Sequence, residues 1–591
     1  MSYDPERITF FAKTDARGKN LPFGIKAKDR SRHVYVIGKT GMGKSTLLEN
    51  MAVQDIRNGE GLAFIDPHGQ TAETLLDYIP PERLKDVLYF APHDMEHPIS
   101  FNVMEDVGAD KRHLVVSGLM SVFEKIWVDA WSARMAYILQ NTLMALLEYP
   151  GATLLGVNRM LSDKNYRKKV VDNIADPSVK SFWVDEFAKY NERYMQEAGD
   201  AIKNKIGQFT ANPLIRNIIG QPKSSFDIRQ IMDERKILIM NLSKGLIGET
   251  NANLLGSMLT TRIYLAAMSR ADMPSEIMQK MPNFYFYVDE FQSFANSTFA
   301  NILSEARKYK LNLTIAHQYI EQMEEDVRNA VFGNVGTTIA FRVGPFDAEI
   351  LETIFAPKFM AVDLVNLGFA QVYLTLMIDG IGSSPFSATT LSPLLRPDNT
   401  SREKIIEESR RQFAKPRAVI EQDIADWHAP LQDDSVEKRI SREGERPRPT
   451  AERKPTHPAP AAVSQPSVAP KTFVPREERQ EGSHTSTKPS YVREQRTVPD
   501  KTKNLDDLRS ILRNLSKNDK EPEKASSKEV VAKPNDLKSV LASVLVAPKP
   551  EISEPKPVLT AEPVVSEDGA IDPKKLERMM RVKTDDRPPL R

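Results

Sequence analysis

The sequence contains no cysteine among its 591 residues. Without thiols there can be no disulfide framework, no thiolate metal site and no cysteine nucleophile, and this composition fits a reducing compartment. No run of about 18 apolar residues occurs, and the first residues, MSYDPER, lack the basic start and apolar middle of a signal peptide. We therefore expect a cytoplasmic protein that has no direct membrane insertion and is not exported by that route.

Net charge is nearly absent as well, because 81 lysines and arginines stand against 80 aspartates and glutamates. Overall charge gives no argument for a nucleic-acid partner, so a surface that binds one would have to be local. Glycine is scarce after residue 400, where only three of the 27 glycines lie, whereas 22 of the 40 prolines lie there. This shift predicts that the folded part of the chain ends near residue 400.

A glycine-rich turn, GKTGMGKS at 38–45, follows the apolar run HVYVI at 33–37. It fits the phosphate-loop pattern G-x-x-x-x-G-K-[ST], with a predicted strand before it and a predicted helix after it. Gly38, Gly41 and Gly43 would take positive φ and turn backbone N–H groups onto phosphate oxygens at the positive end of the helix.

This loop predicts a site for ATP and Mg²⁺. Lys44 would reach the β- and γ-phosphates, and the Ser45 hydroxyl would be a magnesium ligand. The residues expected to bind the nucleotide are Gly38, Lys39, Thr40, Gly41, Met42, Gly43, Lys44, Ser45 and Thr46.

Strands and helices alternate from the phosphate loop to residue 90 at the spacing of a doubly wound parallel sheet. The expected helices are 46–57 and 71–78. Later apolar runs continue the sheet and indicate that both of its faces are covered. The expected strands after the phosphate loop are 62–65, 87–90, 236–242, 284–288, 311–315, 337–341 and 370–374. The predicted fold class is α/β, a RecA-like P-loop NTPase with a mainly parallel central sheet, an inserted all-α domain and a disordered C-terminal tail.

The inserted domain is predicted because the apolar period is helical from about residue 111 to residue 217. We interpret Trp127, Trp131 and Trp183 as packing anchors rather than groups that stack on a ligand. The basic run KNYRKK at 164–169 could face nucleic acid, although such a run is more often a solvated helix face. The expected divisions are an N-terminal strap at 1–30, an ATPase domain at 31–105 and 226–400, and the insertion at 106–225.

Beyond residue 400 we expect a helical linker at 401–440 and a disordered tail at 441–591, whose composition cannot bury a core. Within the tail, DLRSILRNL at 507–515 is echoed by DLKSVLASV at 536–544. These repeats and a third segment predict short amphipathic helices near 505–516, 535–546 and 572–582. Such helices either dock into a groove of an unknown partner protein or have no partner.

Hydrolysis of ATP needs a carboxylate that organises the metal and a group that activates water. Asp289 and Glu290 follow the strand 284–288: the first can hold Mg²⁺, and the second can accept a proton from the attacking water. Gln318 ends a neighbouring strand, where its amide could sense the γ-phosphate or orient water, whereas the adjacent His317 is interpreted as structural.

Two arginines could complete a nucleotide site in a neighbouring subunit. Arg307 lies between the strands that end at Asp289 and at Gln318. This position is too distant for its side chain to reach the nucleotide of its own subunit easily. Arg342 is a second candidate for the same role. Either one would make the enzyme active only as a ring.

Five motifs in order carry a family resemblance: VIGKTGMGKST at 36–46, FIDPHG at 64–69, YVDEFQ at 287–292, EARK at 305–308 and IAHQ at 315–318. Over about residues 20–400 the chain resembles conjugative coupling proteins of the type IV secretion VirD4/TraG kind, within the HerA/FtsK group of DNA-pumping motors.

The resemblance implies hexameric rings with nucleotide at the interfaces and DNA in a central channel. It also implies a trans arginine at Arg307, a sensing glutamine at Gln318, and a metal-contacting or turn-forming role for Asp66. Coupling proteins generally carry N-terminal transmembrane helices, which this sequence does not show. The motor would then be cytoplasmic, or peripheral to the inner membrane through another protein.

Two functions follow as hypotheses. The first is an ATP-driven DNA translocase in which a channel loop, such as the one bearing Lys244, pushes on the phosphate backbone of single- or double-stranded DNA. The alternative is an ATPase platform that recruits or assembles secretion or envelope machinery through its tail helices. A small-molecule kinase fits less well, because the helical insertion and the adjacent Asp-Glu pair suit a motor better.

Overall fold

The computed structural model describes residues 3–15 and 18–429. The predicted tail 441–591, its three helices and the end of the predicted linker lie outside these residues. Within the described ranges, no helix is both long and apolar enough to span a bilayer.

An eleven-stranded sheet runs through the protein in the order β2-β1-β13-β10-β9-β3-β8-β7-β4-β6-β5. The strands from β9 to β5 are parallel, whereas β10, β13, β1 and β2 continue the sheet in antiparallel pairs. Their bounds are β1 (Ile8–Thr14), β2 (Pro22–Lys26), β3 (Val34–Ile37), β4 (Gly61–Asp66), β5 (Val87–Phe90), β6 (Ile237–Asn241), β7 (Phe284–Val288), β8 (Leu311–His317), β9 (Thr337–Ala340), β10 (Gln371–Thr375) and β13 (Phe386–Thr390).

The predicted fold class, an α/β protein with a mainly parallel sheet, is confirmed. In its antiparallel part, the expected N-terminal strap forms the edge hairpin of β1 and β2. The pairing of β13 with β10 was not predicted, and the reason is a local turn. After β10 the chain forms a small hairpin of β11 (Met377–Ile378) and β12 (Ile381–Gly382), and its turn residues Asp379 and Gly380 have φ of 51° and 82°. Asp-Gly is a strong sequence signal for such a reversal, and the reversal returns the chain as β13 beside β10.

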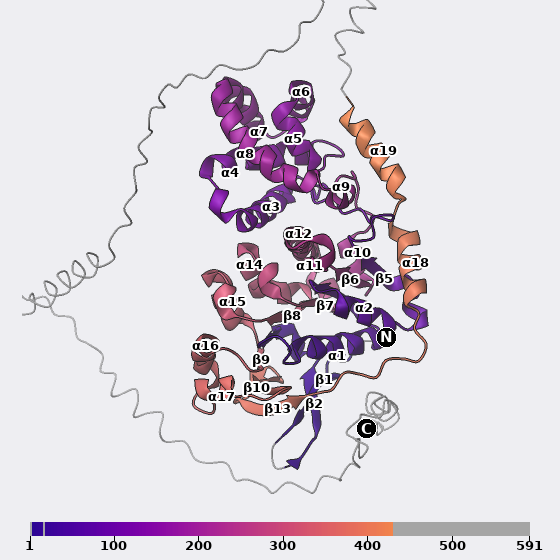
Figure 1. The fold of residues 1–591 in the computed structure, drawn as a ribbon, viewed down its shortest axis with the longest axis vertical. Coiled ribbons are helices and arrows are strands. Elements are labelled where there is room, and N and C mark those ends of the chain that lie inside the picture. Colours follow the sequence, from indigo (N-terminus) through magenta and orange to yellow (C-terminus); the bar gives the residue numbers. More distant parts are fainter. Residues whose placement is uncertain (1–2, 16–17, 430–591) are drawn as a thin grey trace, which may run out of the picture. The chain divides into compact units, whose positions relative to one another are not determined.

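Helices cover both faces of the sheet, as expected for strands that are apolar throughout (Figure 1). In β3, Val34 and Val36 belong to the core that includes α1 (Lys44–Arg57) and α2 (Gln70–Asp77). Tyr35 and Ile37 belong to the other core, with α12 (Glu249–Met268) and α14 (Ser297–Glu305). Alternate side chains of one strand therefore enter different cores, which is the period-two geometry of an extended chain.

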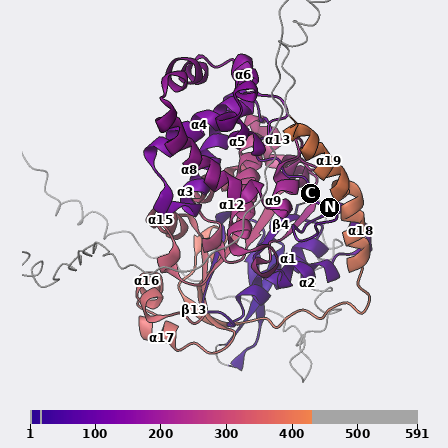
Figure 2. The same cartoon turned by 45° about the horizontal axis from the view of Figure 1, so that its top comes forward.

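Between β5 and β6, a segment that the structure describes throughout, the chain forms helices and no strand. Figures 1 and 2 both show the violet helices α4, α5, α6 and α8 grouped together. The helices are α3 (Arg112–Ile126), α4 (Ala133–Glu148), α5 (Leu155–Ser162), α6 (Lys164–Asn173), α7 (Pro177–Ser181), α8 (Glu192–Thr210), α9 (Pro213–Ile219) and α10 (Ile228–Asp233).

The tryptophans of this helical segment pack against other aromatic rings. Trp127 is buried and stacks on Phe123, with 5.0 Å between ring centroids, and Trp183 is buried against Phe187 at 4.6 Å. Trp131 is partly buried beside Trp127. The interpretation of these residues as packing anchors is confirmed.

The linker region consists of two helices, α18 (Arg402–Phe413) and α19 (Arg417–His428), which run along one side in orange in Figure 1. The Ser409 hydroxyl of α18 accepts a hydrogen bond from the Tyr89 backbone N–H in β5 at 2.9 Å. In α19, Glu421 accepts from the Asn217 amide at 3.2 Å. The two helices thus contact both the sheet and the helical segment.

Candidate nucleotide-binding site

The sheet order brings the predicted motifs to one edge. Strand β8 lies between β3 and β7, and β4 lies beyond β7, all in parallel. The loops that follow the carboxyl ends of these strands carry the glycine-rich turn, Gln318, Asp289-Glu290 and Asp66-Pro67-His68. In open α/β sheets this edge is where ligands bind.

The glycine-rich turn has the backbone geometry of an anion-binding loop at two of its three glycines. Gly41 and Gly43 have φ of 78° and 113°, and α1 begins at Lys44 directly after them. The predicted positive φ is wrong for Gly38. A Cβ there would lie 2.5 Å from Cβ of Phe341, so glycine is required by the close approach of the chain after β9.

Lys44 is folded back onto its own loop. Its Nζ donates to the carbonyl oxygens of Gly38 at 2.6 Å and Lys39 at 3.1 Å. Burial lowers the pKa of Lys44, and the carboxylates of Asp289 and Glu290 oppose this shift. The ammonium group is therefore held beside the phosphate cradle and close to both acidic side chains.

The two predicted magnesium ligands are in contact. The Ser45 Oγ donates to Oδ2 of Asp289 at 2.9 Å, across 244 residues of sequence. Asp289 is buried, and its pKa is raised by burial and by the nearby Asp66 carboxylate, against the Ser45 hydrogen bond. A hydroxyl and one carboxylate are the oxygen donors that Mg²⁺ takes when phosphates supply further ligands, so this pair fits the metal.

Glu290 lies next to Asp289 in a left-handed backbone conformation, with φ of 46°. Its Oε1 accepts hydrogen bonds from Nε2 of His68 at 2.9 Å and from Nε2 of Gln318 at 2.6 Å. Its Oε2 accepts from Nζ of Lys244 at 3.0 Å. The His68 hydrogen bond, with Lys244 adding to it against the effect of burial, lowers the pKa of Glu290 to about 2.

Gln318 connects Glu290 to the phosphate loop. Its Oε1 accepts from the Thr40 hydroxyl at 3.0 Å, while its Nε2 donates to Glu290. A polar chain therefore runs from the loop through Gln318 to the carboxylate. The adjacent His317 is fully buried and contacts the Tyr35 hydroxyl at 3.2 Å, in agreement with a structural role.

Asp66 forms a turn. Its Oδ1 accepts from the backbone N–H of His68 at 2.8 Å, and its Oδ2 accepts from that of Ala72 at 2.9 Å. Both oxygens are thus engaged in fixing the start of α2, and the same turn presents the His68 ring to Glu290. Of the two roles considered for Asp66, the turn-forming one matches this geometry.

The two candidate arginines lie at opposite ends of the strands. Arg307 is exposed in a short turn that precedes β8, away from the edge where Gln318 lies, and it forms no ion pair within residues 3–15 and 18–429. The backbone carbonyl of Arg342, just after β9, accepts from the Lys39 N–H at 2.9 Å. Arg342 therefore lies beside its own phosphate loop, whereas Arg307 does not reach it.

Sequence reasoning missed two partners of Glu290. His68 follows a strand that ends at the same edge as Asp289, and that position was the available signal. Lys244 was considered only as part of a loop facing DNA, and its ammonium group contacts Glu290 and the Ser293 hydroxyl, the latter at 3.0 Å. A pattern of residues along the chain does not give the direction of a lysine side chain, because that depends on which loop lies opposite.

The helical segment also contacts this region. Nζ of Lys125, in α3, donates to the backbone carbonyl of Gln292 at 2.7 Å and to that of Ala295. Burial lowers the pKa of Lys125 to about 8. The loop that follows Glu290 is thus held by a side chain from the insertion.

The fold and this site define a P-loop ATPase with a RecA-like sheet. Residues 15–263 match the family model described as the central domain of helicase HerA, and residues 283–354 match the model described as the TraM recognition site of TraD and TraG. These matches confirm the resemblance seen in the motifs, which is to TraG/VirD4-like ATPases and the HerA group.

Solved structures with a similar fold include the bacterial conjugative coupling protein TrwB (TrwBdeltaN70), at 15% identity and a TM-score of 0.47, covering 66% of this chain and 90% of that one. TrwB in complex with ADP and Mg²⁺ matches at 14% identity and 0.47, covering 66% and 91%. VirB4 of Thermoanaerobacter pseudethanolicus matches at 13% identity and 0.43, covering 66% and 98%. No curated protein sequence matches the chain.

Proposed function

We propose that the protein is an ATP-dependent motor that translocates DNA, with nucleotide sites completed between the subunits of a ring. The observation that carries this proposal is the pair of contacts at one sheet edge, Ser45 with Asp289 and Gln318 with Glu290. They assemble a phosphate cradle, a metal-binding pair and a carboxylate for water from distant parts of the chain.

In this proposal the loop N–H groups and Lys44 bind the β- and γ-phosphates of ATP, and Ser45 and Asp289 hold Mg²⁺. The metal, when bound, offsets charge on the phosphate oxygens. Glu290 accepts the proton of the attacking water, and Gln318, which already touches Thr40, senses the γ-phosphate.

In this structure Glu290 is engaged by His68, Gln318 and Lys244. A carboxylate whose pKa is held near 2 by such partners is a weak base, so these contacts must loosen before Glu290 can accept a proton. We infer that Lys244 and its loop restrain the site at rest, and that contact of this loop with DNA draws the lysine away.

Arg307 completes the site of a neighbouring subunit in this proposal. Its side chain is exposed and lies at the opposite end of β8 from Gln318, so its own nucleotide is out of reach. A head-to-tail ring would bring this face of one subunit to the nucleotide edge of the next. We expect a hexamer, with DNA in the central channel.

The segment 283–354 adds a protein partner to the proposal. The family model that it matches is described as the TraM recognition site of TraD and TraG. We infer that a DNA-bound protein of the TraM type binds here and brings the motor to its substrate.

The test is the rate of ATP hydrolysis by the full chain with and without single- and double-stranded DNA. We expect DNA to raise the rate several-fold, Lys44→Ala to abolish turnover, and Glu290→Gln to bind ATP without hydrolysing it. A rate that neither DNA form changes would contradict the motor and favour the recruitment platform.

A further inference from the structure

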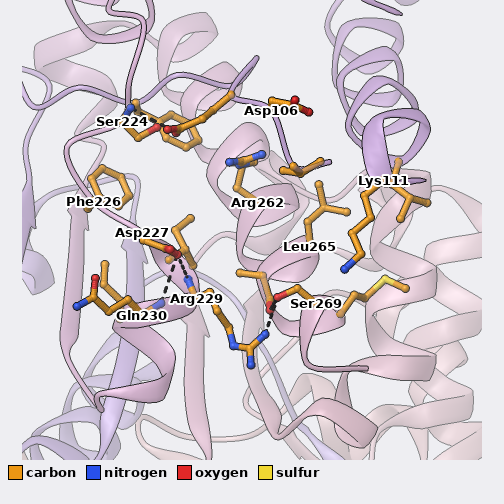
Figure 3. A pocket seen from close by; sticks show the side chains of 18 of the residues that line it. Asp106, Lys111, Ser224, Phe226, Asp227, Arg229, Gln230, Arg262, Leu265 and Ser269 are labelled. Carbon is orange, nitrogen blue, oxygen red and sulfur yellow. Dashed lines mark hydrogen bonds between the residues drawn. The ribbon is translucent and has the colours of Figure 1, made fainter. Parts of the chain in front are cut away.

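A second cavity, of about 630 Å³, lies away from the nucleotide site, and none of the residues described above for that site lines it. Its walls come from α10, α12 and the two chain segments that connect the helical insertion to the sheet, near residues 101–107 and 224–227 (Figure 3). Lys236, directly before β6, also lines it, which places the cavity near the strand starts. Its volume is that of a small-molecule site.

Arg262 of α12 points into this cavity (Figure 3). The residue is partly buried, and Nη1 of its guanidinium is fully buried without a hydrogen-bond partner or an ion pair in the part of the chain that the structure describes. Burial lowers the pKa of Arg262, while the carboxylates of Glu105 and Asp227, both beyond ion-pair distance, oppose that shift.

The other cations of the cavity wall already have partners. Arg229 pairs with Asp233 at 2.6 Å, Lys236 pairs with Glu234 at 2.9 Å, and Lys111 pairs with Asp272. Their charges are therefore compensated without a ligand. Arg262 differs from them, because a partly buried guanidinium whose Nη1 has no acceptor is costly and its planar fork of donors suits a group with two oxygens.

The cavity wall beside Arg262 is apolar. Leu265 lies one turn along α12, and Phe226 packs parallel to Phe101 with ring centroids 6.0 Å apart. Four acidic side chains also line the cavity. Asp106 pairs with Arg112 and Asp272 with Lys111, whereas Glu105 and Asp227 form no ion pair within the described residues. This acidic set would repel a polyanion such as a nucleotide or DNA, whereas a single negative charge next to Arg262 would be accommodated.

We propose that this cavity binds a small organic monoanion, whose carboxylate pairs with the Arg262 guanidinium and whose apolar body packs against Phe226 and Leu265. The ligand would touch α12 and both connections of the insertion at once. The same chemistry is offered by a free organic acid and by an acidic side chain within an apolar peptide.

The experiment uses the full-length protein and 8-anilinonaphthalene-1-sulfonate, a fluorescent monoanion with an apolar body, as the first probe. We expect saturable fluorescence that 4-phenylbutyrate displaces, and at least tenfold weaker displacement in Arg262→Met. Lys111→Met is the matched control, since it removes a cavity cation that is already paired. Its affinity for 4-phenylbutyrate should stay within twofold of that of the unmutated protein.

Two further arms keep the proposal falsifiable. Displacement by 4-phenylbutyrate but not by the blocked peptide acetyl-Leu-Asp-Leu-amide supports a free acid as the source, and the reverse result supports a peptide. Displacement by neither, or equal binding to Arg262→Met, overturns the site.

Thermal unfolding supplies a readout of the unpaired arginine itself. Arg262→Met should keep or raise the Tm of the ligand-free protein, because it removes a partly buried charge whose Nη1 has no acceptor. 4-Phenylbutyrate should raise the Tm of the original and of Lys111→Met but not of Arg262→Met. A clear fall in Tm for the ligand-free Arg262→Met protein would show that Arg262 has a partner within the chain, and would overturn the proposal.

Discussion

At the scale of single residues, the decisive feature is the carboxylate of Glu290. It has a positive φ of 46° and three side-chain donors around it, from His68, Gln318 and Lys244. A non-glycine residue held in this region costs free energy that the surrounding contacts must offset, and such residues cluster at functional sites. The geometry therefore fits the proposed role of Glu290 as a base, with a carboxylate that is positioned but held by its partners.

Removing Lys244 tests the restraint. With Lys244→Met the pKa of Glu290 should rise towards its ordinary range, and basal ATP turnover should increase. A partly buried ion pair is worth about 1 kcal/mol, which corresponds to about fivefold in rate. The measurement is steady-state ATP hydrolysis without DNA, and the stimulation by DNA should shrink in proportion.

The control for this variant is Lys280→Met, which changes an exposed lysine on a different surface element. It should leave both basal and stimulated rates unchanged. A fall in basal turnover with Lys244→Met would mean that the lysine takes part in hydrolysis instead of restraining Glu290.

His68 predicts a dependence on pH. Its hydrogen bond to Glu290 raises the pKa of His68 above the ordinary value of about 6.5. The charged pair is therefore present at low pH and is lost as pH rises through that raised pKa, which removes one of the restraints on Glu290 and leaves those from Gln318 and Lys244. ATP turnover should increase over this range in a profile measured between about pH 6 and pH 9, and His68→Gln should flatten the increase. An unchanged profile in the variant would assign the titration to another group.

At the scale of elements, the N-terminal segment is fixed to the strand that carries the acidic pair. Arg30 is fully buried, and its guanidinium donates to both oxygens of Asp55 in α1, at 2.6 and 2.9 Å, and to the Tyr287 hydroxyl in β7 at 2.7 Å. It also lies 3.8 Å from the centre of the Tyr285 ring. One arginine thus joins three elements beneath the nucleotide site.

Arg30→Met should destabilise the protein by roughly 3–5 kcal/mol, because Asp55 would remain as a buried charge without its partner. The free energy of unfolding is measured by urea denaturation. Adding Asp55→Asn to Arg30→Met should cost less than the sum of the two single changes, since the second removes the unpaired charge. Strict additivity would show that the two groups act independently.

The sequence predicted the bounds of strands correctly where both faces of the strand are buried. The runs 87–90 and 284–288 have the bounds of β5 and β7, because a strand in the middle of a covered parallel sheet is apolar throughout. The prediction failed for β13 (Phe386–Thr390), in which only Ala388 and Thr390 are buried and the other three residues are half-buried. Its pairing with β10 depends on the Asp379-Gly380 turn, and this dipeptide is a sequence signal for a chain reversal.

At the scale of the whole molecule, the shared site predicts complementation between subunits. Arg307→Ala and Lys44→Ala should each be inactive alone, but mixed rings would contain interfaces with one intact half from each variant. An equal mixture should recover about a quarter of the original turnover, since each interface pairs a defined face of one subunit with the other face of its neighbour. ATP hydrolysis after mixing and re-assembly is the measurement.

A mixture of Lys44→Ala with Glu290→Gln is the matched control for this experiment. Both changes damage the same half of the interface, so no combination of subunits restores an intact site and turnover should stay at background. Co-assembly of Arg307→Ala with Lys44→Ala without any recovery would contradict a site shared between subunits.

The sequence by itself determined the features that depend on neighbours in the chain. These are the phosphate loop, the acidic pair after an apolar strand, and the alternation that buries both faces of the sheet. The tertiary structure alone decided which groups meet: Lys244 and His68 at Glu290, and Arg30 at Asp55. It also leaves Nη1 of Arg262 without an acceptor among the residues that it describes. The physical reason is that local pattern sets backbone conformation and burial, whereas the partner of a charged side chain depends on strand order and on loops distant in sequence.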